Sequence, residues 1–159
     1  MIVLTAACLM AAAQSYAVPA ESLYSVLRIE GGWVGLAKPN LRENGTIRSE
    51  DLGPFQINTA WLPTFTAYWH QPGQSATYAL LRDDGCASAY GAAAIVRYHW
   101  QQTGNLDRAI AMYHTGPKGS PAAMARYLAR YRRILEDVFG SRARRRPGEA
   151  GVPAILPPY

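Results

Sequence analysis

The chain has 159 residues, which is enough for one domain with a buried core. Its 49% hydrophobic and 11% aromatic residues are typical of a compact globule and exclude a disordered chain. The formal net charge is +5, but Arg142, Arg144, Arg145 and Arg146 supply +4 of it. The rest of the chain has a net charge of only +1, so it lacks the basic surplus that indicates nucleic-acid binding.

Two interpretations of the apolar N-terminus stay open. It can be a secretory signal peptide with Ala11–Ala13 as the cleavage site, but no Lys or Arg precedes the apolar run, and the run is short for a signal. It is also too short to span a bilayer. We favour the alternative, in which a first helix runs from about Ile2 to Tyr16 within residues 1–16. An export signal would then lie upstream of this start.

A second helix is predicted to end at Glu30. A proline and an acid near residue 20 are typical of a helix start. Apolar residues at helical spacing then lead to Glu30, so its carboxyl group shares a face with buried aliphatic side chains. Gly31 and Gly32 follow directly and leave no side chain to crowd a ligand. The sequence therefore predicts one carboxyl group at the edge of an open space.

The stretch from Trp33 to Ile47 predicts a loop or a short β ribbon. It is rich in Gly, Pro and Asn, and Asn44-Gly45 is its clearest turn signal, so any small β element is expected here. The next segment, Gly53 to Asn58, reads G-P-F-Q-I-N and combines apolar anchors with two amide side chains. Amides both donate and accept hydrogen bonds, which suits a ligand covered in hydroxyl and acetamido groups.

The remainder of the domain is predicted to be helical. Asn58 can cap a short helix that carries Trp61 and Leu62, and Pro63 can begin the next turn. Later helices are expected at 64–69, 75–82, 86–101, 106–114 and 122–138. The last of these is amphipathic, and its predicted inner side comprises Met124, Tyr127, Leu128, Tyr131, Leu135 and Val138. Residues 140–159 lack periodicity and predict a disordered basic, Pro-rich tail.

Three ordered motifs resemble the lytic transglycosylases of the soluble-lytic, goose-lysozyme-like superfamily. They are Glu30 at a helix end, D-L-G-P-F-Q-I-N at 51–58 and A-M-Y-H-T-G at 111–116. The resemblance covers roughly Cys8 to Val138. It implies a mostly α (α+β), lysozyme-like fold over residues 1–139, with a small β or loop lobe beside the catalytic cleft.

The resemblance also implies roles for individual residues. Glu30 would be the catalytic acid, and the hydroxyl of Tyr113 would hydrogen-bond it. Cys8 and Cys86 would form a disulfide; two cysteines without a CxxC motif or a His cluster favour such a bond over a metal site. Trp61 offers an apolar wall and is at least as well suited to the core, as is Phe55. The substrate-binding residues would be Gly53, Phe55, Gln56, Asn58, Tyr113 and His114.

The expected chemistry is cleavage of a glycosidic bond with one carboxyl group. Such cleavage needs an acid that still holds its proton near neutral pH, and burial favours that form. Ordinary glycosidases use two carboxyl groups, but Glu43, Glu50 and Asp51 lie in polar loop sequence where a surface role is the default. The resemblance implies that the 6-hydroxyl group of N-acetylmuramic acid attacks instead, giving a 1,6-anhydro product. No cofactor or metal is expected.

The chain departs from the family pattern at three positions. Gly31 replaces the usual Ser, Phe55 replaces Met, and His114 stands where Asn is usual. Two alternatives therefore stay open: a lysozyme-type muramidase, and a catalytically weak peptidoglycan-binding assembly factor. The expected setting is the periplasm or cell envelope, with peptidoglycan strands as substrate and a secretion, conjugation or pilus machine as partner. We expect a monomer that binds no nucleic acid, since four tail arginines without interleaved aromatics are thin support for a nucleic-acid arm.

Overall fold

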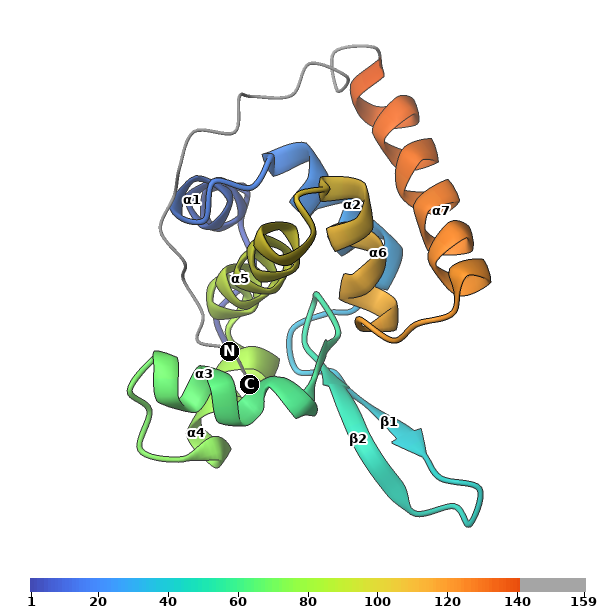
Figure 1. Cartoon of the computed structure of the whole chain (residues 1–159). Helices are drawn as coiled ribbons and strands as arrows, with labels where there is room; N and C mark the ends of the chain where they lie inside the picture. Colours follow the sequence, from blue (N-terminus) through green and yellow to red (C-terminus); the bar gives the residue numbers. More distant parts are fainter. Residues whose placement is uncertain (141–159) are drawn as a thin grey trace.

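Helix α5 (Gly85–Thr103) runs through the middle of the molecule, and α1, α4 and α6 pack against it (Figure 1). Its first turn is capped by the Asp84 carboxylate, which accepts hydrogen bonds from the backbone N–H groups of Cys86 and Ala87. One stretch of the helix is almost entirely Ala and Gly and is fully buried. Small side chains let neighbouring helices approach closely, so α5 serves as the central support of the fold.

This computed structural model describes residues 1–140. Within that range the protein has an α+β architecture, mostly helical with one small antiparallel sheet. The helices predicted from the sequence are present, with several ends displaced by one or two residues. The other elements in chain order are α1 (Ala6–Ser15), α2 (Ala20–Glu30), β1 (Ala37–Leu41), β2 (Ile47–Leu52), β3 (Ile57–Asn58), the 3-10 helix η1 (Thr59–Trp61), α3 (Leu62–Tyr68), α4 (Gln74–Asp83), α6 (Leu106–Thr115) and α7 (Pro121–Phe139).

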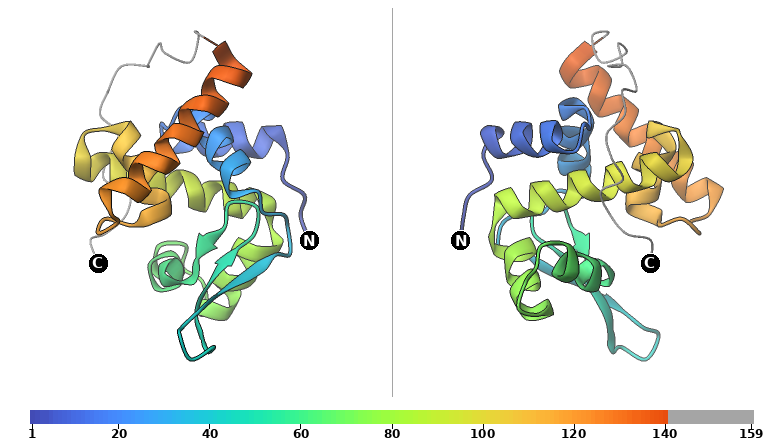
Figure 2. Two further views of the ribbon diagram at one scale, coloured as in Figure 1. Left: turned by 90° about the vertical axis from the view of Figure 1, so that its right-hand side faces the viewer. Right: turned by 60° about the vertical axis from the view of Figure 1, so that its left-hand side comes forward.

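The β ribbon expected between Trp33 and Ile47 is present as the hairpin β1–β2, but β2 and β3 extend the sheet to Asn58, beyond the predicted stretch. The two strands pair antiparallel, and the chain reverses at Asn44-Gly45, where Gly45 adopts a positive φ of 79°. Strand β3 adds to the other side of β2, giving the order β1-β2-β3. Figures 1 and 2 show the hairpin projecting away from the helices. One face of the sheet is therefore available to form a wall of a cleft.

The first helix begins at Ala6, four residues later than the sequence predicts. Ile2 is held in extended conformation instead, because its N–H donates to the Asp83 carbonyl and its carbonyl accepts from the N–H of Gly85. Thr5 then caps α1 by accepting a hydrogen bond from the N–H of Cys8. No helix in the described part of the chain is long and apolar enough to cross a bilayer.

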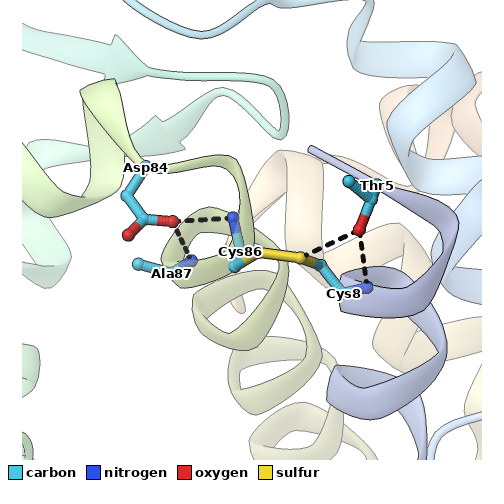
Figure 3. The surroundings of a disulfide bond; sticks show 5 residues. All are labelled: Thr5, Cys8, Asp84, Cys86 and Ala87. Atoms are coloured by element: carbon cyan, nitrogen blue, oxygen red, sulfur yellow. Dashed lines mark hydrogen bonds between the residues drawn. A yellow bond between two sulfur atoms is a disulfide. The ribbon is translucent and has the colours of Figure 1, made fainter. Parts of the chain in front are cut away.

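A disulfide joins Cys8 of α1 to Cys86 at the start of α5 (Figure 3). The two Cα atoms are 5.0 Å apart, and the bond closes a loop of 78 residues. Both cysteines follow helix caps, Thr5 for α1 and Asp84 for α5, so the bond ties together two helix N-termini. The pairing implied by the family resemblance is therefore confirmed.

Helix α7 packs on α2 through two buried tyrosines, Tyr127 and Tyr131. The Tyr131 hydroxyl shares a hydrogen bond of 2.8 Å with the Ser22 hydroxyl. The predicted inner side is wrong at Val138, which is 50% exposed, because Phe139 rather than Val138 contacts Tyr24 in the last turn. The predicted tail lies outside the described residues apart from Gly140.

Replacing both Cys8 and Cys86 by Ser should lower the free energy of unfolding by about 4 kcal/mol, because the unfolded chain regains the freedom of a long loop. Urea denaturation of the oxidised proteins measures this difference. Adding a reductant should destabilise the parent and leave the double variant unchanged. A loss below about 1 kcal/mol would show that the bond contributes little.

Candidate active site

A cleft of about 710 Å³ lies between the sheet and the C-terminal halves of α5 and α6. This volume is within the range of small-molecule sites. Most of the side chains around it are polar or aromatic. The lining comprises Glu30, Lys38, Asn40, Arg48, Asp51, Gln56, Ile57, Asn58, Ala60, Trp61, Ile95, Tyr98, His99, Gln102, Met112, Tyr113, His114, Thr115, Gly116 and Pro117.

Glu30 is the last residue of α2 and enters this cleft with 12% of its side chain exposed. The Tyr127 hydroxyl donates a hydrogen bond of 2.7 Å to its Oε1 atom. Within residues 1–140, Oε2 has no hydrogen-bond partner. One carboxyl oxygen is thus fixed by the protein, and the other remains available to a ligand.

Glycine is favoured at positions 31 and 32 for two different structural reasons. Gly31 caps α2 in the left-handed conformation, with φ 63°, and a Cβ atom there would meet nothing within 4 Å. At Gly32 a Cβ atom would collide with the Gly53 carbonyl oxygen and the Gln56 amide, and would press on the Pro54 carbonyl oxygen. The absence of a side chain at Gly32 therefore lets the end of α2 pack directly on the 53–56 turn.

Two predicted substrate-binding residues do not reach the cleft. Phe55 is fully buried in the core, so it offers no wall to a ligand; its carbonyl oxygen accepts a hydrogen bond of 2.8 Å from the Tyr113 hydroxyl. Gly53 is also buried, with φ 65°. A Cβ atom at this position would collide with the Leu81 carbonyl oxygen, so no side chain fits. Both residues shape the turn rather than contact a ligand.

Gln56 and Asn58 line the cleft as predicted, but their amides are used within the protein. The Gln56 Nε2 atom donates to the Gly53 carbonyl at 2.9 Å, which supports a residue held at the unusual φ of 49°. The Asn58 Nδ2 atom donates to Asp51 at 2.7 Å and to the Ser49 hydroxyl at 3.0 Å. Its Oδ1 atom accepts from the N–H of Ala60 and so caps η1.

The tyrosine that holds the acid is Tyr127, not Tyr113. Tyr113 donates to the Phe55 carbonyl, and burial raises its pKa well above the ordinary value. Burial raises the pKa of Tyr127 as well, with a further contribution from the nearby Glu30 charge, so its phenol stays a donor. The sequence placed Tyr127 on the inner side of the last helix, but nothing in it indicated a contact with a residue 97 positions away.

His114 stacks on Tyr127 with ring centroids 4.7 Å apart and an angle of 10° between the planes. Its Nδ1 atom lies 3.7 Å from Glu30 Oε1. The pKa of His114 is raised because Glu30 can accept a hydrogen bond from the protonated ring and attracts its charge, whereas partial burial opposes this. The residue that departs from the family pattern is thus in direct reach of the candidate acid.

Asp51 is not the surface acid that the sequence suggested. It lies on β2, half-buried, on the sheet face that lines the cleft. Asn40 of β1 donates to its Oδ2 atom at 2.9 Å, and Asn58 donates to its Oδ1 atom at 2.7 Å. The alternating side-chain direction of β2 sends Glu50 to the other face, where it accepts a hydrogen bond from Tyr78. Glu43, at the hairpin tip, is exposed as expected.

Aromatic residues line the cleft at its α5 side. Trp61 is half-buried and lines the cleft, while its ring also packs against Phe65, Tyr98 and His99. Trp61 therefore belongs both to the cleft lining and to the aromatic packing beside it. His99 is buried, and this burial lowers its pKa to about 4, so the ring stays neutral near pH 7.

Comparison of the chain with protein-family models, curated proteins and solved structures found no significant match. Among residues 1–140, no group of three or more His, Cys, Asp and Glu side chains is arranged to hold a metal ion.

The pKa of His114 should lie above its ordinary value of 6.5 in the parent and fall in Glu30→Gln, because the variant removes the negative charge beside the ring. Titration of the histidine ring signals by NMR measures both values, with buried His99 as an internal reference. A raised pKa in the folded state means that this pair stabilises the protein below about pH 6.5 and that the contribution disappears as the pH rises through the folded value. An unchanged His114 titration in the variant would contradict the contact.

Proposed function

We propose that the protein is a peptidoglycan lytic transglycosylase, which cleaves the β-1,4 bond between N-acetylmuramic acid and N-acetylglucosamine. The observation that carries this proposal is the Glu30 carboxyl group, largely enclosed at the end of α2, with Oε1 held by Tyr127 and with no partner for Oε2 among residues 1–140. A general acid needs such an arrangement, in which the protein fixes the group and leaves the proton-bearing oxygen to the substrate.

In the proposed reaction, protonated Glu30 donates its proton to the glycosidic oxygen as the bond to the anomeric carbon breaks. The resulting carboxylate then accepts the proton of the 6-hydroxyl group of the same muramic acid while that oxygen bonds the anomeric carbon. The products are a 1,6-anhydro sugar and a free 4-hydroxyl group, and no water is consumed. Tyr127 keeps the carboxyl group in one orientation through both proton transfers.

The rest of the cleft supports a carbohydrate ligand. Its lining combines the aromatic side chains of Trp61 and Tyr98 with the polar side chains of Asn40 and Asn58. Sugars present apolar ring faces and polar edges, so a site with both kinds of surface suits them. The mostly helical architecture with a small sheet beside the cleft is consistent with a lysozyme-like fold, which we include in the proposal.

The proposed location is the bacterial cell envelope. The Cys8–Cys86 disulfide supports it, because such bonds form and persist in oxidising compartments. The small single domain suits local opening of the wall for a secretion, conjugation or pilus machine, which we propose as the setting. Peptidoglycan strands would be the substrate of a monomeric enzyme.

Glu30→Gln should fold normally and lose wall-degrading activity by at least about 100-fold, because an amide cannot donate the proton. Release of soluble fragments from purified sacculi measures the loss, and circular dichroism verifies the fold. Glu43→Gln is the matched control, since it changes an exposed carboxyl group at the hairpin tip in the same way. Activity near that of the parent would refute the assignment of Glu30.

A second candidate function, a muramidase of lysozyme type, is favoured by one specific observation. Asp51 brings a second carboxyl group to the cleft that holds Glu30, and Asn40 and Asn58 fix both of its oxygens. A carboxylate so placed can position a water molecule or stabilise positive charge at the anomeric carbon, as the second acid of a glycosidase does. The two candidates differ in the nucleophile and hence in the product.

Mass spectrometry of digested peptidoglycan distinguishes them. We expect muropeptides that end in 1,6-anhydro-N-acetylmuramic acid, lighter by one water than hydrolysis products, and we expect Asp51→Asn to retain anhydro product formation. Reducing-end products that disappear in Asp51→Asn would establish the muramidase. Binding to sacculi without any soluble product would support a peptidoglycan-binding assembly factor instead.

A further inference from the structure

Two cations line the sheet side of the cleft and have no partner among residues 1–140. Lys38 lies on β1 and Arg48 on β2, and both side chains are exposed. Within residues 1–140 neither makes a side-chain hydrogen bond or an ion pair. Both therefore remain free to bind a negatively charged group on a ligand.

The neighbouring acids do not need these cations as counter-ions. Lys38 is directly opposite Asp51 in the strand register, yet the two Asp51 oxygens accept hydrogen bonds from Asn40 and Asn58. Glu50 is turned away and bonds Tyr78. Amide donors thus satisfy Asp51. Lys38 and Arg48 are therefore not neutralised by this carboxylate and can bind a negatively charged group in the cleft.

The glycan strand that the proposed function requires gives these cations nothing to neutralise. N-acetylglucosamine carries no charge, and the carboxyl group of N-acetylmuramic acid is consumed in an amide bond wherever a peptide stem is attached. The negative charges of peptidoglycan are the free carboxylates of those stems. Cations at the wall of a glycan cleft therefore match the stems and not the sugars.

We infer that Lys38 and Arg48 bind peptide-stem carboxylates, so that the cleft selects glycan strands whose stems carry free carboxylates over strands whose stem carboxylates are amidated. This inference rests on the proposed function. The position of the hairpin supports it. Strands β1 and β2 extend beyond the helices (Figures 1 and 2), and residues of both strands line the cleft, so a side branch of the substrate can lie along them. Exposed ion pairs are individually weak, so each cation should contribute roughly two- to fivefold in affinity.

Binding by the Glu30→Gln protein tests the inference without requiring cleavage. Calorimetry would compare two soluble glycan fragments of equal length that both carry stems: one with free stem carboxylates, and one with these carboxylates converted to amides. The protein should bind the first about tenfold more tightly than the second. Introducing both Lys38→Ala and Arg48→Ala should abolish this preference and leave the affinity for the amidated fragment unchanged.

Arg133→Ala is the matched control, because it removes one exposed positive charge on α7 away from the cleft. It should retain the full preference. Equal affinity of the Glu30→Gln protein for both fragments would overturn the inference, as would a loss of affinity in the Lys38→Ala, Arg48→Ala variant that is the same for both fragments. Failure of the parent to cleave any strand would refute the proposed function, yet the binding comparison would still decide the role of Lys38 and Arg48.

Discussion

The site depends on one close approach, in which the end of α2 packs against the turn at residues 53–56. Only a glycine fits at position 32, because any side chain would collide with the Gly53 carbonyl group of that turn. The contact fixes Glu30 relative to the sheet. Since the same turn is anchored in the core by Phe55 and bonded by Tyr113, the acid is positioned by the core of the protein and not by a flexible loop. Preorganisation of this kind is what an acid catalyst needs.

Helix α7 provides a second support for Glu30. Tyr127 is buried between α7 and the rest of the domain, bonds Glu30 and stacks on His114. The three residues come from α7, α2 and α6, so the packing of these helices and the orientation of the carboxyl group are coupled. The Ser22–Tyr131 hydrogen bond one turn further along α7 secures the same interface. A change in the packing of α7 would therefore alter the orientation of the Glu30 carboxyl group.

The cleft divides its chemistry between two walls. The helical wall contributes the acid, its tyrosine and a histidine. The sheet wall contributes a carboxylate whose two oxygens are held by Asn40 and Asn58, together with the cations Lys38 and Arg48. The alternation of side chains along β2 creates this pattern, because it sends Asp51 into the cleft and Glu50 to the far face. Proton transfer is thus proposed for one wall and recognition of substrate charge for the other.

The sequence by itself determined the helices, the hairpin turn, the caps at Asn58 and the position of Glu30 at a helix end, because these follow from local spacing and turn chemistry. The cysteine pairing came from family resemblance and agrees with the structure. Only the tertiary structure decided that Tyr127 rather than Tyr113 holds the acid, that Phe55 is core and that Asp51 enters the cleft. Each of these depends on which segments distant in sequence pack together, and local periodicity carries no information about such partners.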